Sequence, residues 1–322
     1  MSGPARPIMA APWESMNHEW AVQRRLDDIF AKLGEKFGDL RGRVEVTLRP
    51  GVSFDEVGGL DTVKVTLRGF AHGLTNPERY RQWGITPPRG VLLYGPPGAG
   101  KSMLARALAT TSEAIFYHLK LLNLTSKFGA NTAELLHEIL NIAVTEGKGV
   151  LYLDRADALA LEHLLPPVQA REAGARLAAA LCEKFDGFTD SARILVVAST
   201  SRTDAIDPSL VAAGRLDHLI EIPLPDVAAQ GEILRIVRRR AEREAGRELF
   251  DVVDERKILP MLGGMSGADI AEIMRRALEV KVHQVAEGTD PSPVSTEDVV
   301  QAIDSFKRVR GVVEKIRYGQ YL

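Results

Sequence analysis

The chain has 322 residues, 45% of them hydrophobic and 26% charged, a balance typical of a globular protein with one large or two modest domains. A formal net charge of −2 excludes a general attraction to nucleic acid or to anionic membranes, so neither is an expected partner. The single cysteine, Cys182, excludes intramolecular disulfides and zinc sites built on cysteines.

The amino-terminal region contains neither a secretory signal nor a run of ~18 to 20 apolar residues, so we expect a cytoplasmic protein without a membrane span. Residues 1–16 begin with a Pro- and Ala-rich stretch and predict a disordered tail. Residues 17–43 predict an amphipathic helix, because apolar side chains recur at steps of three and four: Val22, Leu26, Ile29, Leu33, Phe37 and Leu40. This helix either packs on its own domain, which the short heptad pattern slightly favours, or pairs with copies of itself as a coiled coil.

Residues 44–224 alternate short apolar runs with helical patterns. The runs at 91–94, 150–154 and 194–199 are rich in Val, Ile and Leu, as in strands buried on both faces of a parallel sheet. Helices predicted at 101–112, 131–146 and 171–185 complete a doubly wound α/β domain. In residues 225–309 the strand signal disappears, and predicted helices form a small all-helical second domain: 226–245, 255–262, 266–286 and 295–308.

The strand at 91–94 is followed by the sequence GPPGAGKS and then by a predicted helix, which is the context of a phosphate-binding loop. Gly98 and Gly100 allow backbone N–H groups to turn toward phosphate oxygens. Lys101 would reach the outer phosphates, and the Ser102 hydroxyl would ligate Mg²⁺. The sequence therefore predicts ATP and Mg²⁺ as cofactors, held by Gly95, Pro96, Pro97, Gly98, Ala99, Gly100, Lys101, Ser102 and Met103.

Asp154 ends the strand at 150–154, where its carboxylate is expected to hold the magnesium ion. Hydrolysing enzymes of this design follow that Asp with a Glu that acts on the attacking water, and here the next residue is Arg155. Since a general base supplies ~10² to 10⁴ in rate, we expect ATP binding with weak or absent turnover unless Asp157 or another carboxylate substitutes. Arg155 either pairs with the γ-phosphate or with Asp154 or Asp157.

Further motifs in the expected order give the chain its resemblance to AAA+ ATPases, most closely to proteasomal ATPases. They run from Phe54 to about Val309: FDEVGGLD (54–61), NPERYRQWGITPPRGVLLYGPPGAGKS (76–102), DGF (186–188), TDAIDPSLVAAGRLDH (203–218) and SGADI (266–270). The resemblance implies a P-loop α/β domain with a helical lid. It also implies that Gly58, Gly267 and Ala268 lie near the adenine and ribose.

The same resemblance implies a ring, usually a hexamer, with ATP between subunits. Arg215 matches the arginine that a neighbour donates to the γ-phosphate, Ser201 stands where the phosphate-sensing Asn is usual, and His218 replaces a second arginine. Lys127 and Phe128 match the loop that grips a polypeptide substrate in the channel. For Phe128 the alternative is an anchor for the following helix.

Residues 310–322 predict a flexible tail. Its last residues, Gly319, Gln320, Tyr321 and Leu322, resemble the ending with which the actinobacterial proteasomal ATPase and the bacterial proteasome activator dock on a core proteasome. The resulting prediction is an ATP-binding ring subunit, homo- or hetero-hexameric, that acts as a proteasome-associated unfoldase or activator. The alternatives are a non-catalytic partner in a mixed ring and a remodelling ATPase unrelated to proteolysis.

Overall fold

The computed structural model describes residues 12–187, 193–290 and 292–317. The predicted docking segment Gly319–Leu322 and residues 1–11 of the predicted tail lie outside this part of the chain. Helix α1 (Pro12–Phe37) begins five residues before the predicted boundary at 17, and the segment 12–16 is therefore helical.

Six strands of the described chain form one sheet in the order β1-β3-β4-β5-β2-β6. Their bounds are β1 (Val44–Thr47), β2 (Gly90–Tyr94), β3 (Ile115–Lys120), β4 (Gly149–Asp154), β5 (Ile194–Thr200) and β6 (His218–Glu221). Strands β2 to β6 are mutually parallel, which confirms the predicted parallel sheet and the three predicted strands β2, β4 and β5. The edge strand β1 differs, because it pairs antiparallel with β3 and places Glu45 opposite His118.

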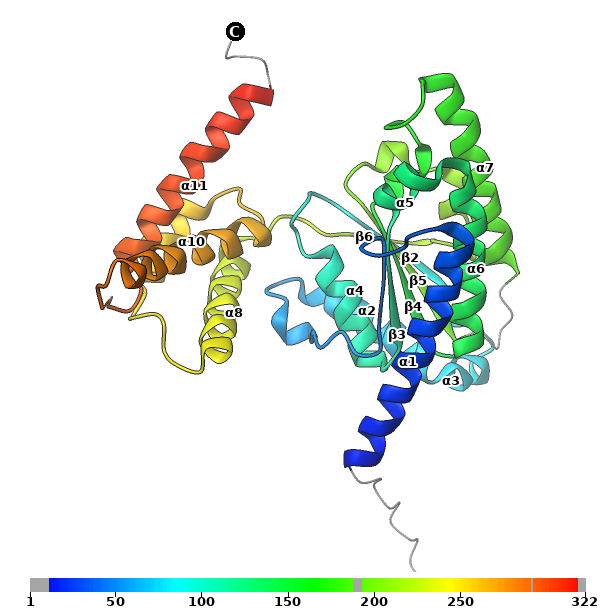
Figure 1. Cartoon of the computed structure of the whole chain (residues 1–322), viewed down its shortest axis with the longest axis horizontal. Coiled ribbons are helices and arrows are strands. Elements are labelled where there is room, and N and C mark those ends of the chain that lie inside the picture. Colours follow the sequence, from blue (N-terminus) through cyan, green and yellow to red (C-terminus); the bar gives the residue numbers. More distant parts are fainter. Residues whose placement is uncertain (1–11, 188–192, 291, 318–322) are drawn as a thin grey trace, which may run out of the picture.

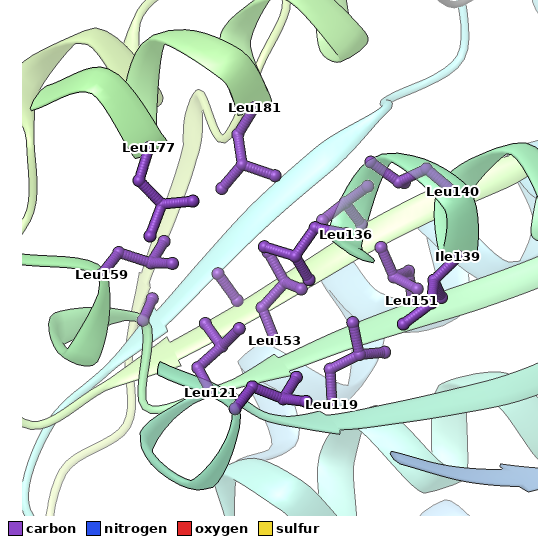
Figure 2. Packing of buried hydrophobic residues seen from close by; sticks show 14 of the residues in the cluster. Leu119, Leu121, Leu136, Ile139, Leu140, Leu151, Leu153, Leu159, Leu177 and Leu181 are labelled. Atoms are coloured by element: carbon purple, nitrogen blue, oxygen red, sulfur yellow. The ribbon is translucent and has the colours of Figure 1, made fainter. Parts of the chain in front are cut away.

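Helices cover both faces of the sheet (Figure 1). One face carries α2 (Asp61–Thr75) and α4 (Lys101–Ser112), and the other carries α6 (Thr132–Glu146) and α7 (Pro167–Asp186). Alternate residues of β4 supply the two cores. Tyr152 joins the cluster under α2 and α4, whereas Leu151 and Leu153 join leucines of α6 and α7 (Figure 2). Burial on both faces explains the continuous apolar runs in the sequence.

Helix α1 packs on its own domain, the arrangement that the heptad count favoured. Its Leu26 is fully buried and Leu33 belongs to the same core cluster as α6. At the edge of this contact Lys36 Nζ lies 3.0 Å from Glu134 and 3.0 Å from Glu138 of α6. The two helices lie side by side in Figure 1. The apolar stripe of α1 is therefore used within the chain.

Two short helices, α3 (Pro77–Gln82) and α5 (Leu121–Phe128), connect elements of this domain. The second part of the chain is helical: α8 (Val227–Ala245), α9 (Glu255–Ile258), α10 (Gly267–Ala286) and α11 (Thr296–Arg317). They enclose a separate apolar cluster that includes Leu234, Ile273 and Ile303. Helix α11 extends to Arg317, so residues 310–317, expected in a flexible tail, are helical instead.

Candidate nucleotide-binding site

Three glycines shape the loop between β2 and α4. Gly95, Gly98 and Gly100 have φ angles of 142°, 77° and 102°, a region that L side chains rarely adopt. A Cβ on Gly95 would also lie only 2.2 Å from the carbonyl oxygen of Ile222. The loop can follow this path only with glycine at these positions.

Lys101 lies across the loop that it follows. Its Nζ donates to the carbonyl oxygens of Gly95 at 2.7 Å and Pro96 at 2.8 Å, and to Ser201 Oγ at 3.3 Å. Burial lowers the pKa of Lys101, and the nearby charges of Asp154 and Asp157 offset part of that shift. The loop thus presents a cation held by neutral oxygens, and the predicted residue Ser201 lies beside it.

The first turn of α4 suits a bound phosphate. Gly100 precedes it without a side-chain cap, and the turn carries no acidic residue. The N–H groups of a helical first turn have no partner within the helix, and the helix dipole favours an anion there. Ser102 is exposed at the same turn. These features fit the phosphates of ATP.

Asp154 occupies the end of β4 and is held by three side chains. Its Oδ1 accepts hydrogen bonds from Tyr152 Oη at 3.2 Å and Ser199 Oγ at 3.1 Å, and its Oδ2 lies 3.4 Å from His118 Nε2. Burial raises the pKa of Asp154, but these hydrogen bonds and the charge of His118 outweigh it, so the pKa lies below the usual value. An ionised, partly exposed carboxylate is a suitable ligand for Mg²⁺.

Among the described residues there is no cluster of three or more His, Cys, Asp or Glu that could hold a metal without help from a ligand. The Asp154 carboxylate and the Ser102 hydroxyl are groups of the kind that bind Mg²⁺, which in nucleotide sites is held by one or two protein groups plus phosphates. In the same part of the chain no helix is long and apolar enough to cross a bilayer.

Arg155 directly follows β4 and pairs with a nearby carboxylate. Its φ of 59° is in the left-handed region, and its guanidinium lies 3.4 Å from Asp157 Oδ2. Asp157 is mostly buried and also accepts a 2.9 Å hydrogen bond from Thr200 Oγ1. Of the two pairings predicted for Arg155, the structure contains the one with Asp157. The contact with a γ-phosphate stays a prediction.

A cavity of about 520 Å³ lies where the α/β domain meets the helical domain. Glycine is required at its wall, because a Cβ on Gly58 would lie 2.6 Å from Ile233 Cγ1. The helical domain also contacts the phosphate loop directly, since Ala268 N donates to Gly98 O at 3.1 Å. The residues that line the cavity include Gly58, Gly59, Leu60, Ala99, Pro225, Ala229, Glu232, Ile233 and Gly267. The structure thus brings the predicted residues Gly267 and Ala268 to the phosphate loop, and the predicted residue Gly58 lines the same cavity as Ala99 of that loop.

Arg215 lies at the end of the sheet opposite to the phosphate loop. Its carbonyl group packs on Gly90, the first residue of β2, whereas the phosphate loop follows the last residue of that strand. Five residues of strand separate the two ends by roughly 17 Å. The guanidinium forms a two-point ion pair with Asp186, at 2.9 and 2.6 Å, and donates to Ser209 O. The chain does not bring Arg215 to its own phosphate loop.

Lys127 and Phe128 end helix α5. Lys127 Nζ donates to the carbonyl oxygen of Asp39 at 2.9 Å and lies 5.3 Å from the centre of the Phe128 ring. Phe128 is half-buried and packs against the core cluster of α6 and α7. The anchoring role considered for Phe128 therefore has a structural basis, and its contact with a substrate stays a prediction.

Several polar residues of the site were not predicted from the sequence: His118, Tyr152, Ser199, Thr200 and Glu232. Ser199 and Thr200 end the apolar run of β5, and polar residues at the carboxyl end of a parallel strand are a usable signal. His118 interrupts the apolar pattern of β3 in a similar way. Glu232, whose Oε2 accepts from Gly59 N at 2.7 Å, carries no such signal because it lies on the helical α8.

Comparison with known proteins agrees with this geometry. Residues 91–224 match the ATPase family associated with various cellular activities (AAA). The chain is 31% identical over 298 residues to a proteasome-activating nucleotidase of Saccharolobus solfataricus, covering 92% of this chain and 73% of the relative. It is 34% identical to the proteasome-activating nucleotidase of Thermococcus onnurineus, with 94% and 75% of the two chains covered.

Proposed function

Since this chain belongs to the ATPase family associated with various cellular activities (AAA), we propose that it is a ring subunit that binds Mg·ATP and hydrolyses it weakly or not at all. In this role it serves as a proteasome-associated unfoldase or activator. One observation carries the proposal: Lys101 of the glycine loop is close enough to Asp154 for their charges to interact, and the residue after Asp154 is an arginine paired with Asp157.

ATP binding can persist at this site without efficient hydrolysis, because the two depend on different residues. The glycines, Lys101 and the first turn of α4 supply donors and positive charge for phosphates, and Asp154 supplies an ionised carboxylate for the metal. A general base must accept a proton from water, which a guanidinium cannot do. Asp157, the other carboxylate nearby, is occupied by Thr200 and Arg155. Cleavage of ATP to ADP and phosphate is therefore slow.

The position of Arg215 supports a ring. It lies at the opposite end of β2 from the phosphate loop of its own chain, so it can reach a γ-phosphate only across a subunit boundary. Asp186 pairs with it in the single chain. In the ring the guanidinium exchanges this partner for nucleotide bound to the neighbour.

The partners of the ring follow from the relatives. The two relatives reported above are named proteasome-activating nucleotidases, and they match over 92% and 94% of this chain. A core proteasome is the proposed partner, with the segment Gly319–Leu322 as the docking element and Phe128 as the residue that contacts a polypeptide in the channel. Co-purification with a core proteasome, compared with a chain that lacks Gln320–Leu322, tests the docking element.

The central test is nucleotide binding by the purified chain. A fluorescent ATP analogue is expected to bind with Mg²⁺ present, and Lys101→Ala is expected to lower the affinity at least about tenfold, because a charged hydrogen bond contributes about 1.5 to 3 kcal/mol. Lys148→Ala, in the turn before β4, is the matched control and is expected to bind like wild type. Wild-type protein without affinity for adenine nucleotides would refute the proposed function.

A further inference from the structure

A buried histidine joins the amino-terminal strand to the metal side of the site. His118 on β3 is 6% exposed and lies between carboxylates from the strands on either side. Its Nδ1 lies 3.3 Å from Glu45 Oε2 on β1, and its Nε2 lies 3.4 Å from Asp154 Oδ2 on β4. Carboxylate oxygens only accept hydrogen bonds, so the ring nitrogen is the donor in each hydrogen bond, and both nitrogens donate together only when the ring carries both protons.

The surroundings of His118 hold the ring in one orientation. It packs against the rings of Phe116 and Tyr152, with centroids at 6.0 and 5.2 Å. Glu45 is itself held, because its carboxylate contacts the ammonium of Lys120. That hydrogen bond is the main reason why the pKa of Glu45 lies below its usual value.

The two oxygens of Asp154 have separate donors. Tyr152 and Ser199 both donate to Oδ1, whereas His118 approaches Oδ2. Removing His118 therefore removes the contact that fixes the second oxygen and leaves the first in place. Side chains that hold a metal ligand from behind commonly change metal affinity about 10- to 100-fold when mutated.

We propose that His118 is a positioning residue that orients the Asp154 carboxylate toward Mg²⁺, and that Glu45 orients His118. Strand β1 then completes the metal side of the nucleotide site, although it lies outside residues 91–224 that match the AAA family. The inference rests on the proposed binding of Mg·ATP. It concerns how much Mg²⁺ the site needs, and not whether nucleotide binds.

The experiment measures the affinity of the full chain for a fluorescent ATP analogue, first in EDTA and then across a Mg²⁺ titration. His118→Leu replaces the donor with an apolar side chain of similar size, and we expect the Mg²⁺ concentration at half effect to rise about tenfold. His118→Gln places an amide N–H near the position of Nε2, and we expect its Mg²⁺ concentration at half effect to be within about threefold of the wild-type value. Affinity in EDTA is expected to stay unchanged.

Glu45→Gln provides a second variant, because its side chain is partly exposed and the change leaves the buried ring in place. We expect it to raise the Mg²⁺ requirement about threefold, less than His118→Leu. Glu134→Gln is the control, since it also removes an ion pair between the amino-terminal segment and the α/β domain but lies on α6.

Three results would overturn the inference. The first is an unchanged Mg²⁺ requirement in both His118→Leu and Glu45→Gln, and the second is a Mg²⁺ requirement that rises as much in Glu134→Gln as in Glu45→Gln. The third is a Mg²⁺ requirement in His118→Gln as high as in His118→Leu. If His118→Leu does not fold, the comparison of Glu45→Gln with Glu134→Gln decides. Failure of the proposed function is distinguishable, because the wild type itself would then bind no nucleotide at any Mg²⁺ concentration.

Discussion

Two neighbouring residues at the end of β4 carry the proposed separation of ATP binding from hydrolysis. Asp154 keeps an ionised carboxylate because its hydrogen bonds outweigh burial. Arg155, one residue later, takes a left-handed backbone conformation and directs its guanidinium to Asp157. The proposed metal ligand is thus retained, while the position next to it holds a group that cannot accept a proton.

Replacing Arg155 by glutamate is expected to restore hydrolysis. The change removes the partner of Asp157 and supplies a carboxylate at the place where a base acts, and a general base is worth ~10² to 10⁴ in rate. Because Ser201 and His218 also depart from the usual residues, we expect a gain of at least about tenfold in phosphate release, not a full recovery.

The measurement is phosphate release at saturating Mg·ATP. Arg171→Glu, an exposed arginine on α7, is the control for the change in charge and is expected to behave like wild type. Brisk hydrolysis by the wild type, or no gain in Arg155→Glu despite unchanged ATP binding, would contradict the role assigned to Arg155.

At the scale of elements, the phosphate loop and the amino end of α10 depend on each other. Ser266 caps α10 by accepting from Asp269 N at 3.2 Å, and Asp269 accepts from Ser266 N at 2.9 Å. The same serine approaches the loop, because a Cβ on Gly98 would lie 2.5 Å from Ser266 Oγ. The helical domain can therefore close on the loop only while Gly98 has no side chain.

Gly98→Ala is expected to weaken ATP binding at least about tenfold and to lower the free energy of unfolding by about 1 to 3 kcal/mol, because its φ of 77° disfavours a side chain. Gly246→Ala is the matched control. Gly246 has a φ of 66° with nothing within 4 Å of the added Cβ, so it carries the backbone cost without the clash. Urea unfolding and ATP titration check both variants, and equal loss of ATP affinity in the two would count against a specific contact.

Over the whole molecule, the nucleotide cavity is shared between two separately built cores. The α/β domain encloses its sheet between two apolar clusters, and the helical domain has a cluster of its own. The cavity of about 520 Å³ has walls from both domains, so a nucleotide bound as proposed would contact both. The proposed nucleotide binding would therefore depend on the relative placement of the two domains, and the proposed role of Arg215 would link it to ring assembly.

We expect Mg·ATP to shift the purified chain from smaller species to a ring, since nucleotide supplies the partner that Arg215 exchanges for Asp186. Light scattering of the chain with and without Mg·ATP measures the mass. Arg215→Ala is expected to bind nucleotide like wild type but to assemble less. A mass that does not respond to nucleotide in the wild type would argue against assembly through this arginine.

The sequence by itself determined the elements with long local patterns and the phosphate loop. The runs that became β2, β4 and β5 are continuous in the chain, and the sequence GPPGAGKS defines the loop through local backbone requirements. The helices α4 and α8 follow the predicted bounds for the same reason, since their periodicity is contained within the segment.

Only the tertiary structure decided which distant residues meet. Strand β1 has four residues, too few for a pattern, and it forms because the edge of β3 offers backbone partners. Its Glu45 comes within reach of His118 and, through it, Asp154, across 109 positions of sequence. Arg215 meets Asp186 in the same way. Such contacts depend on how strands are ordered in the sheet, and local propensity contains no information about that order.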